Sequence, residues 1–346
     1  MSLPELTAPV SLTRTDGRLN PHAVGWARQP LVDTAGIGRG RGRNKRWEYW
    51  GIVTDTHLVG VTVSSIDFAA VHEVWVHEIA TGREWHRSAT LVPDRGATLP
   101  ATLGDGPARG RARGLAVDID GPARGRARCL AVDIDEVEGG TRLRARIDGA
   151  VVDVLARLPP DHERLSVVVP WSATRFQYTV KDVARPATGT LTLEGHTHLL
   201  PEGRSWAVLD HGRGRWPHDV RWNWGAGSGT TDGRTIGVQV GGRWTEGTGS
   251  TENAVVIDGR LHHIPVELDF DYDIARWREP WRITGGGLDA TFAPFHLKAT
   301  HTDLGPLAAH TDQCFGHWSG IFTDEGGRVT PFVDLAGWAE EVHNRW

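Results

Sequence analysis

Cysteine is nearly absent from the chain. The two cysteines, Cys129 and Cys314, are too few for a disulfide framework, and their spacing fits neither a redox pair nor a zinc ribbon. No apolar run approaches the roughly 18 residues that a membrane span requires. The first residues also lack the basic start and apolar stretch of a secretory signal, so we expect a cytoplasmic protein without a transmembrane segment.

A strong charge excess and the familiar catalytic signatures are also missing. A net charge of -5 gives no general attraction to nucleic acid. The basic stretch "GRGRGRNKR" (38–46) contains no aromatic residue, so we interpret it as a solvated loop, with an anion site or a peripheral membrane contact as alternatives. The chain has no G-x-S-x-G, no H-E-x-x-H, no Walker loop and no G-x-G-x-x-G in a suitable context. We therefore predict no cofactor and no nucleic-acid partner.

Glycine and tryptophan are abundant instead, with 43 and 16 residues. Many glycines without long helical patterns indicate many tight turns between short strands. Asp-Gly pairs, which favour two-residue hairpins, occur at Asp16, Asp105, Asp120, Asp148, Asp232 and Asp258. These features predict a mainly β protein.

Alternating patterns locate the strands. In "TRLRARIDG" (141–149) and "VELDFDYD" (266–273), apolar and charged residues alternate with the period of a half-buried strand. Further strands are expected over 58–65, 71–79, 164–170, 188–194, 235–241, 253–258, 260–266, 287–292 and 295–301. Only the C-terminal stretch suggests a helix, because Trp338, Val342 and Trp346 are spaced four apart.

A fifteen-residue unit occurs twice in tandem, at 105–119 and 120–134, with Gly114 replaced by Cys129 in the second copy. Two short units cannot build a solenoid, so we interpret them as an insertion in a surface hairpin, with a basic arm as the alternative. Cys129 is therefore a poor catalytic candidate.

The length of 346 residues favours two domains. The composition changes near 195–205, where a half with six tryptophans gives way to a half with ten. We therefore predict domains at 1–197 and 198–346.

The main catalytic candidates lie in "WAVLDHGRGRWPHDVRWNWG" (206–225). An Asp210 carboxyl in an apolar cavity would hold its proton near neutral pH and act as a general acid beside His211. Tryptophan faces from Trp206, Trp216, Trp222 and Trp224 would stabilise a developing carbocation. Neighbouring strand residues point to opposite faces, so this site requires a turn, which we place at "HGRG". Alternatively, Asp210 caps a turn or pairs with an arginine while the tryptophans fill a core.

Other residues could line the same cavity. Trp222 and Trp224 share a face of "RWNWG", and Asn223 could orient a carbonyl if it points inward. Tyr178 in "FQYTVKD" is either a proton donor, an anchor or a core residue. The last candidates are Trp244 and, on a pocket rim or a plain loop in "GTGSTEN", Glu252 and Asn253.

Metal binding is not predicted. The acids between Glu267 and Asp273 fit the outer face of a strand. The His196–His198 and His262–His263 pairs are expected by chance among 17 histidines.

Several motifs together resemble one bacterial family, the domain of unknown function DUF2804. They are "KRWEYWGIVTD", "FQYTVKD", "LDHGRGRWPHDVRWNWGAGSG", "GGRWTEGTGSTENAVVIDGRLHHI" and "QCFGHWSG". The resemblance covers about residues 10–346 and departs only in the duplicated segment. That family is distantly similar to two-barrel lipocalin-like proteins of the carotenoid hydratase (hydroxyneurosporene synthase) type, some of whose relatives cyclise polyenes.

The resemblance implies an all-β fold of two tandem lipocalin-like (calycin-type) antiparallel β-barrels, to which we add the short C-terminal helix. By the more distant similarity, Asp210 is the proton donor, His211 its partner, and Trp222 and Trp224 the cavity wall. We expect cofactor-independent acid catalysis, namely hydration, isomerisation or cyclisation of a hydrophobic unsaturated small molecule in an apolar cavity. The alternatives are a carrier of a lipid-like ligand and a purely structural module. Family resemblance alone does not decide between them.

Overall fold

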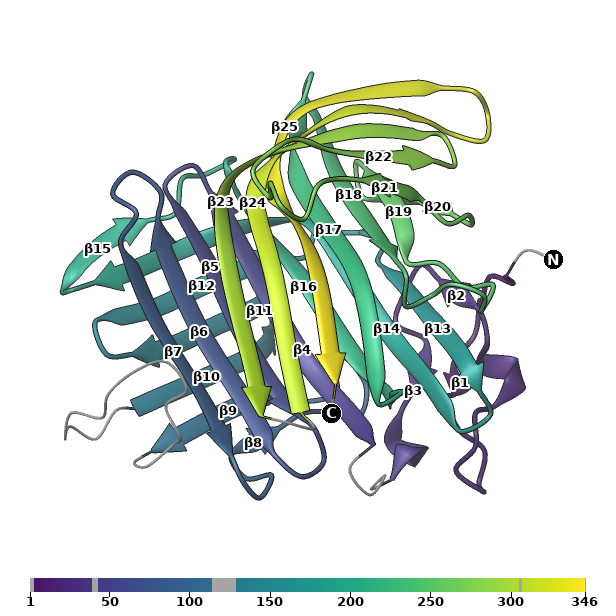
Figure 1. Cartoon of the computed structure of the whole chain (residues 1–346). Helices are drawn as coiled ribbons and strands as arrows, with labels where there is room; N and C mark the ends of the chain where they lie inside the picture. Colours follow the sequence, from purple (N-terminus) through teal and green to yellow (C-terminus); the bar gives the residue numbers. More distant parts are fainter. Residues whose placement is uncertain (1–2, 39–42, 114–128, 305–306, 346) are drawn as a thin grey trace.

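The computed structural model describes residues 3–38, 43–113, 129–304 and 307–345. Within them the chain forms two large antiparallel sheets and a small parallel pair, β1 (Val10–Ser11) with β3 (Val32–Asp33) (Figure 1). Helical structure in these residues is limited to two 3₁₀ turns, η1 (Pro21–Ala23) and η2 (Ala35–Ile37). In this part of the chain no helix is long and apolar enough to cross a membrane.

The first sheet contains fourteen strands. Its main path runs through β7 (Glu84–Leu91), β6 (Ala70–Glu78), β5 (His57–Ser65), β4 (Asn44–Thr54), β16 (Ser205–Arg215), β14 (Arg175–Leu193), β12 (Ala150–Arg157), β11 (Gly140–Ile147), β10 (Cys129–Val137), β9 (Ala108–Arg113) and β8 (Ala97–Thr98). Three further strands join beside this path: β13 (Leu165–Ser172), β15 (His196–Leu199) and β2 (Trp26–Ala27).

Strand β14 bends the first sheet back on itself. Its first half pairs with β16, its second half pairs with β12, and the register shifts between Asp182 and Arg185. Ala184 lies within this bulge with a positive φ of 59°. A bulge bends a strand and increases its twist. As a result, β9, β10 and β11 pack against β5, β6 and β7, and the sheet forms a half-barrel.

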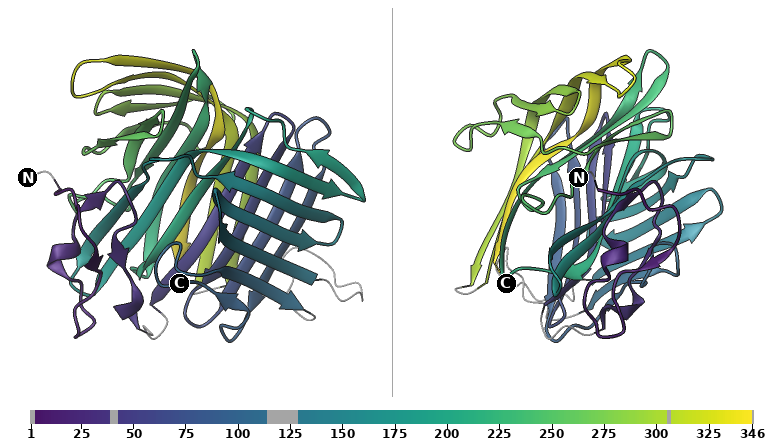
Figure 2. Two further views of the ribbon diagram at one scale, coloured as in Figure 1. Left: turned by 180° about the vertical axis from the view of Figure 1, so that it is seen from behind. Right: turned by 90° about the vertical axis from the view of Figure 1, so that its right-hand side faces the viewer.

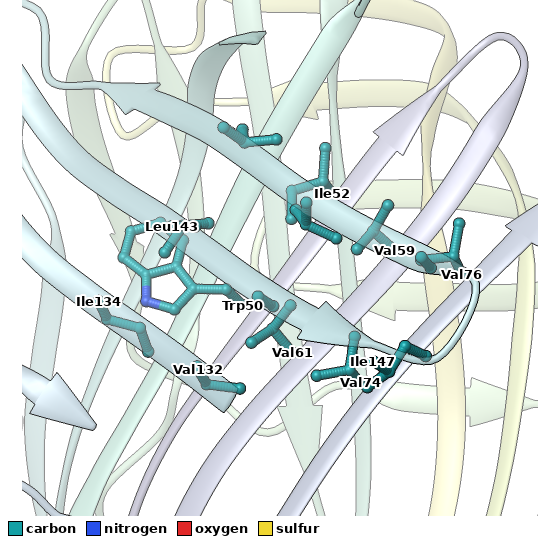
Figure 3. Packing of buried hydrophobic residues seen from close by; sticks show 14 of the residues in the cluster. Trp50, Ile52, Val59, Val61, Val74, Val76, Val132, Ile134, Leu143 and Ile147 are labelled. Atoms are coloured by element: carbon teal, nitrogen blue, oxygen red, sulfur yellow. The ribbon is translucent and has the colours of Figure 1, made fainter. Parts of the chain in front are cut away.

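The interior of this half-barrel is a continuous apolar core. On β4, β5 and β6, alternate residues such as Trp50, Val61 and Val74 point inward. They meet residues of the returning strands, including Leu143 on β11 and Val132 on β10 (Figure 3). The period of two residues therefore sends one side of β4 into this core and leaves its other side for the second sheet.

The second sheet has nine strands and also curls into a half-barrel. Its order is β20 (Arg260–Ile264), β19 (Asn253–Ile257), β18 (Arg234–Gly242), β17 (Asp219–Thr231), β25 (Val329–Arg345), β24 (Leu307–Thr323), β23 (Leu288–Leu304), β22 (Trp281–Gly285) and β21 (Asp269–Asp271). The long strands β23, β24 and β25 lie across the outer face of the first sheet (Figures 1 and 2).

A second apolar core joins the two sheets. It contains Trp75 and Trp206 from the first sheet and Trp224, Phe315 and Trp338 from the second. Its aromatic rings pack closely: Trp75 stacks on Phe315 at 5.2 Å, and Trp224 contacts Trp338 edge to face at 5.2 Å. This aromatic layer fixes the position of one half-barrel on the other.

The structure confirms the all-β class and shows two curled antiparallel sheets. The prediction of a C-terminal helix is wrong, because strand β25 continues to Arg345 and pairs with β17 on one side and β24 on the other. A spacing of four residues also places Trp338 and Val342 on one face of a strand, so the pattern fits both periods. Trp346 lies outside the described residues.

Other predicted segments differ in detail. In 266–273 only Asp269–Asp271 is a strand, and the strands predicted at 287–292 and 295–301 are one strand, β23. The two repeat copies supply β9 and β10, which pair with each other, while 114–128 and 39–42 lie outside the described residues. The predicted boundary between 197 and 198 falls within β15, and the sheets change between Arg215 and Asp219.

Substitution of Gly51 tests the tight contact between this residue of the first sheet and Trp338 of the second. A side-chain carbon at Gly51 would lie 2.4 Å from the ring of Trp338, whereas one at Gly60, its partner across the ladder, would find its nearest neighbour at 3.6 Å. Because a packed core yields little, we expect Gly51→Ala to reduce the free energy of unfolding by about 1–3 kcal/mol in urea titrations. Gly60→Ala is the control, and equal losses in both variants would contradict this packing.

Candidate active site

A cavity of about 280 Å³ lies between the two sheets. Five tryptophans and eight charged side chains contribute to its wall. The full lining is Lys45, Arg46, Trp47, Tyr49, Thr62, Ser64, Ile66, Glu73, Thr179, Lys181, Asp210, Trp216, Trp222, Trp224, Trp244, Glu252, Lys298, Thr311, Gln313, Glu340 and Asn344. The sequence predicted an apolar cavity. The structure instead shows a cavity that combines an aromatic wall with ionisable groups.

One transverse row of the first sheet forms one side of the cavity. Its members are direct neighbours across five adjacent strands, β14, β16, β4, β5 and β6. This first-sheet row consists of Lys181, Asp210, Tyr49, Thr62 and Glu73. Residues opposite one another in a ladder share a face, so the register alone gathers these side chains.

A transverse row of the second sheet faces it. This second-sheet row consists of Trp224, Glu340, Gln313 and Lys298, on strands β17, β25, β24 and β23. The rows meet at three points, with Lys181 Nζ 4.1 Å from the centre of the Trp224 ring, Gln313 Nε2 donating to Tyr49 Oη at 3.4 Å, and Lys298 Nζ donating to Glu73 Oε1 at 2.8 Å. The two sheets thus hold each other in register at both ends of the cavity.

Lys181 connects two carboxyl groups. Its Nζ lies 3.1 Å from Asp210 Oδ1 and 3.3 Å from Glu252 Oε2, and its side chain is only 5% exposed. Burial alone would lower the pKa of Lys181, but the two carboxylates raise it above its ordinary value. Asp210 also accepts a hydrogen bond from Thr179 Oγ1 at 3.2 Å. Asp210 is therefore the acceptor of a buried ion pair.

Glu252 projects into the cavity from the loop between β18 and β19. Trp244, in the same loop, donates its indole N–H to Glu252 Oε1 at 2.5 Å. Gly241 leaves room for this carboxyl, since a side-chain carbon there would lie 2.1 Å from Glu252 Oε1. The loop is fixed to β13 by Ser250, whose hydroxyl donates to the Val168 carbonyl at 2.9 Å.

The Glu252 carboxyl holds its proton unusually strongly. Burial raises its pKa to about 7, Asp210 adds to the rise, and Lys181 and Trp244 oppose it. An indole N–H can only donate, so Oε1 is an acceptor and the acidic proton belongs on Oε2. Oε2 is buried 3.3 Å from the Lys181 ammonium, but this contact lacks hydrogen-bond geometry. Oε2 is therefore available to a bound molecule.

Glu340 is a second carboxyl with a raised pKa. Burial raises its pKa to about 7, although Trp222 and Lys181 oppose the change. Its two oxygens accept hydrogen bonds from Trp222 Nε1 at 3.2 Å and Gln313 Nε2 at 3.0 Å. Both oxygens thus accept hydrogen bonds from uncharged donors, whereas Glu252 Oε2 lies beside the Lys181 ammonium.

Stacked indoles form the aromatic wall. Trp216 and Trp244 are nearly parallel, with ring centres 5.5 Å apart and an angle of 9°. Trp222 and Trp47 meet Trp216 edge to face at 5.7 Å and 5.5 Å. Gly212 admits Trp47, because a side-chain carbon at that position would lie 2.1 Å from the indole. The wall is rigid, apolar and rich in π faces.

The family assignment follows from the whole chain. The model of the family described as a domain of unknown function (DUF2804) matches residues 4–346. The chain belongs to the DUF2804 family. The resemblance noted in the sequence is thereby confirmed.

Solved structures similar to this DUF2804 chain include a Nitrosomonas europaea protein provisionally named AttH (12% identity, TM-score 0.47, covering 87% of this chain and 92% of that one). Kievitone hydratase from Nectria haematococca is 13% identical, with a TM-score of 0.46 and coverage of 88% and 89%. CghA is 10% identical, with a TM-score of 0.39 and coverage of 87% and 88%. No curated protein sequence matches this DUF2804 chain significantly.

The structure brings together six of the predicted site residues of this DUF2804 chain. Those that line the cavity are Asp210, Trp216, Trp222, Trp224, Trp244 and Glu252. Trp206 lies in the inter-sheet core without lining the cavity. Asn223 points away and donates to Tyr272 Oη at 2.9 Å, and Asn253 accepts from the Gly241 N–H at 2.7 Å.

The pairing of Asp210 with His211 needs correction. Strand β16 continues from Ser205 to Arg215, so the predicted turn at "HGRG" is a strand and the two side chains point to opposite faces. His211 is fully buried with its Nδ1 3.5 Å from Glu48 Oε1. Burial and the nearby Arg213 lower the pKa of His211 to about 4, although Glu48 opposes this.

Tyr178 lies on that opposite face too. Its ring packs in an apolar cluster with Leu12 and Phe176, and burial raises its pKa. The alternation predicted for "FQYTVKD" is correct, but the polar side of the strand, with Thr179 and Lys181, faces the cavity.

Sequence reasoning missed Lys181, Glu340, Gln313, Glu73 and Lys298. Only the ladder register of distant strands brings them together. Among the described residues, neither the His196–His198 pair nor the His262–His263 pair belongs to a group of three possible metal ligands.

Glu252 should make stability depend on pH. Its pKa is about 7 in the folded chain and near the ordinary 4.5 when unfolded, so the folded state binds the proton more tightly between these values. This contribution is complete below about pH 4.5 and is lost as the pH rises through about 7. Each tenfold difference in proton affinity is worth about 1.4 kcal/mol. Glutamine cannot ionise at this position. We therefore expect the free energy of unfolding, measured in urea, to fall less in Glu252→Gln than in the wild type between pH 5 and pH 8.

The exposed Glu246 in the same loop provides the control. Glu246→Gln should follow the wild type. The assignment fails if Glu252→Gln and the wild type lose the same stability over this pH range.

Proposed function

We propose that the protein is an enzyme that protonates a carbon–carbon double bond of a hydrophobic small molecule bound in the inter-sheet cavity. The observation that carries the proposal is the Glu252 carboxyl, which is buried in the cavity wall, has a pKa raised to about 7 and holds Oε2 3.3 Å from the Lys181 ammonium without hydrogen-bond geometry. A general acid works best when its pKa lies near the operating pH.

Glu252 is the proton donor in this proposal, in place of Asp210. Asp210 is engaged by Lys181 at 3.1 Å and by Thr179, which suits a carboxylate. Its negative charge raises the pKa of Glu252. Asp210 is therefore a positioning residue, and Glu340, whose oxygens both accept hydrogen bonds, is the candidate for accepting a proton later in the reaction.

The reaction begins with transfer of the Oε2 proton to one alkene carbon. The π electrons form the new C–H bond, the adjacent carbon becomes a cation, and Glu252 becomes a carboxylate beside the Lys181 ammonium. The π faces of Trp216 and Trp222 stabilise the cation. Water addition with return of a proton to Glu252 gives hydration, and loss of a neighbouring proton to the Glu252 or Glu340 carboxylate gives isomerisation. Attack by a second double bond closes a ring and moves the cation to another carbon, and loss of a proton from the adjacent carbon to Glu340 completes cyclisation.

Deuterium labelling tests this function before the natural substrate is known. A panel of isoprenoid and polyketide alkenes is incubated with the protein in heavy water, and mass spectrometry follows carbon-bound deuterium. We expect incorporation with the wild type and a loss of at least about 100-fold in Glu252→Gln, because a general acid contributes that much or more. Glu246→Gln should remain active.

Ligand retention separates catalysis from carriage. Native mass spectrometry of freshly purified protein should find the same apolar molecules on the wild type and on Glu252→Gln. Bound alkenes without any deuterium incorporation by the wild type would identify a carrier protein and refute the proposed chemistry.

Asp210→Asn tests the positioning role. Activity should fall as the pH rises through about 7, because only protonated Glu252 can donate. Removing the negative charge of Asp210 should lower the pKa of Glu252 and move this limb of the pH–rate profile to lower pH. An unmoved limb in Asp210→Asn would rule out the electrostatic link between the two groups.

A further inference from the structure

Three potential metal ligands converge at a second place where the sheets meet. His77 on β6 and Glu84 on β7 are direct neighbours across the first sheet. His296 approaches them from β23 of the second sheet. One ligand atom from each residue lies within 4.8 Å of the other two.

The two distances to Glu84 fit a tetrahedral ion. Metal–ligand bonds of about 2.1 Å at tetrahedral angles place neighbouring ligand atoms about 3.4 Å apart. Glu84 Oε1 lies 3.2 Å from His77 Nδ1 and 3.4 Å from His296 Nε2. Two imidazoles and one carboxylate are the ligands of many zinc sites that keep a fourth position open.

The His296 ring stacks on Trp75 at 5.9 Å in the aromatic packing between the sheets. Its Nε2 is buried and makes no hydrogen bond to any described residue. A register shift between Pro294 and His296 marks a bulge in β23, and bulges re-aim side chains. The two imidazole rings lie 3.9 Å apart between centres. Nε2 lies 3.4 Å from Glu84 Oε1 without hydrogen-bond geometry, and a buried imidazole nitrogen held in this way needs an explanation.

We propose that His77, Glu84 and His296 bind one divalent transition-metal ion of the zinc class, with water at the fourth position. Histidine nitrogens exclude calcium and magnesium, which prefer oxygen ligands. Glu84 is 41% exposed, which leaves a route for the ion and for water.

The ion would join β6 to β23 beside the cavity. On the same faces of these strands, Glu73 and Lys298 form the ion pair that closes the end of the cavity. A metal bridge four residues along β6 and two residues along β23 would fix these strands more firmly. This inference is independent of the proposed catalysis.

Metal titration of the full chain tests the site. Protein stripped with a chelator is titrated with Zn²⁺ by calorimetry, and Co²⁺ substitution reports four-coordinate geometry through its visible absorption. We expect one equivalent to bind and to raise the melting temperature. Loss of a supporting residue around a metal costs about 10–100-fold in affinity, so His296→Gln and Glu84→Gln, which remove ligands, should each cost at least about tenfold.

The control is His310→Gln, which removes a half-exposed histidine that pairs with Asp303. It should bind the ion as the wild type does. Glu84→Gln replaces a half-exposed side chain by an isosteric one, so it keeps the test valid if His296→Gln does not fold. The site is refuted if the wild type takes up no stoichiometric ion, or if His310→Gln weakens binding as much as the ligand variants.

Discussion

The arrangement of the cavity depends on the Lys181 ammonium. It joins Asp210 of the first sheet to Glu252 of a loop in the second, with Trp224 against its Nζ. Burying the charge of Lys181 or of Asp210 alone would cost several kcal/mol, so these two groups must meet. The negative charge of Asp210 opposes the effect of Lys181 on the pKa of Glu252, so burial is the main influence on that pKa. A structural contact between the half-barrels thereby also sets the protonation state of the site.

The strands were predictable because apolar and polar residues alternate within short segments of the sequence. "TRLRARIDG" and "FQYTVKD" have the faces that their alternation predicted. The C-terminal segment failed because residues four apart share a face in both a helix and a strand. Only pairing with β17 and β24 decides between them, and those partners lie far away in the chain. The bend at Ala184 had no local signal either, because nothing in the sequence marks a non-glycine residue with positive φ.

The cavity was predicted in part, for the same physical reason. The tryptophan cluster and Glu252 stand out as residue types in a compact stretch. Lys181, Glu340 and Lys298, by contrast, look like surface charges in their own segments, and their burial follows from the register of the two rows. His211 was misplaced because its glycine-rich surroundings suggested a turn. In β16, Gly212 instead makes room for Trp47 within an uninterrupted strand.

The position of the duplicated segment explains how the fold tolerates it. Residues 114–128 separate β9 from β10, and their number equals one repeat unit. Ala112 and Leu130 pair directly, and in a chain with a single copy only two residues would stand between them, enough for a tight hairpin. The pairs from Ala108 with Ile134 to Ala112 with Leu130 therefore keep their partners with or without the second copy. A single replication error could add the unit without any compensating mutation elsewhere in the gene.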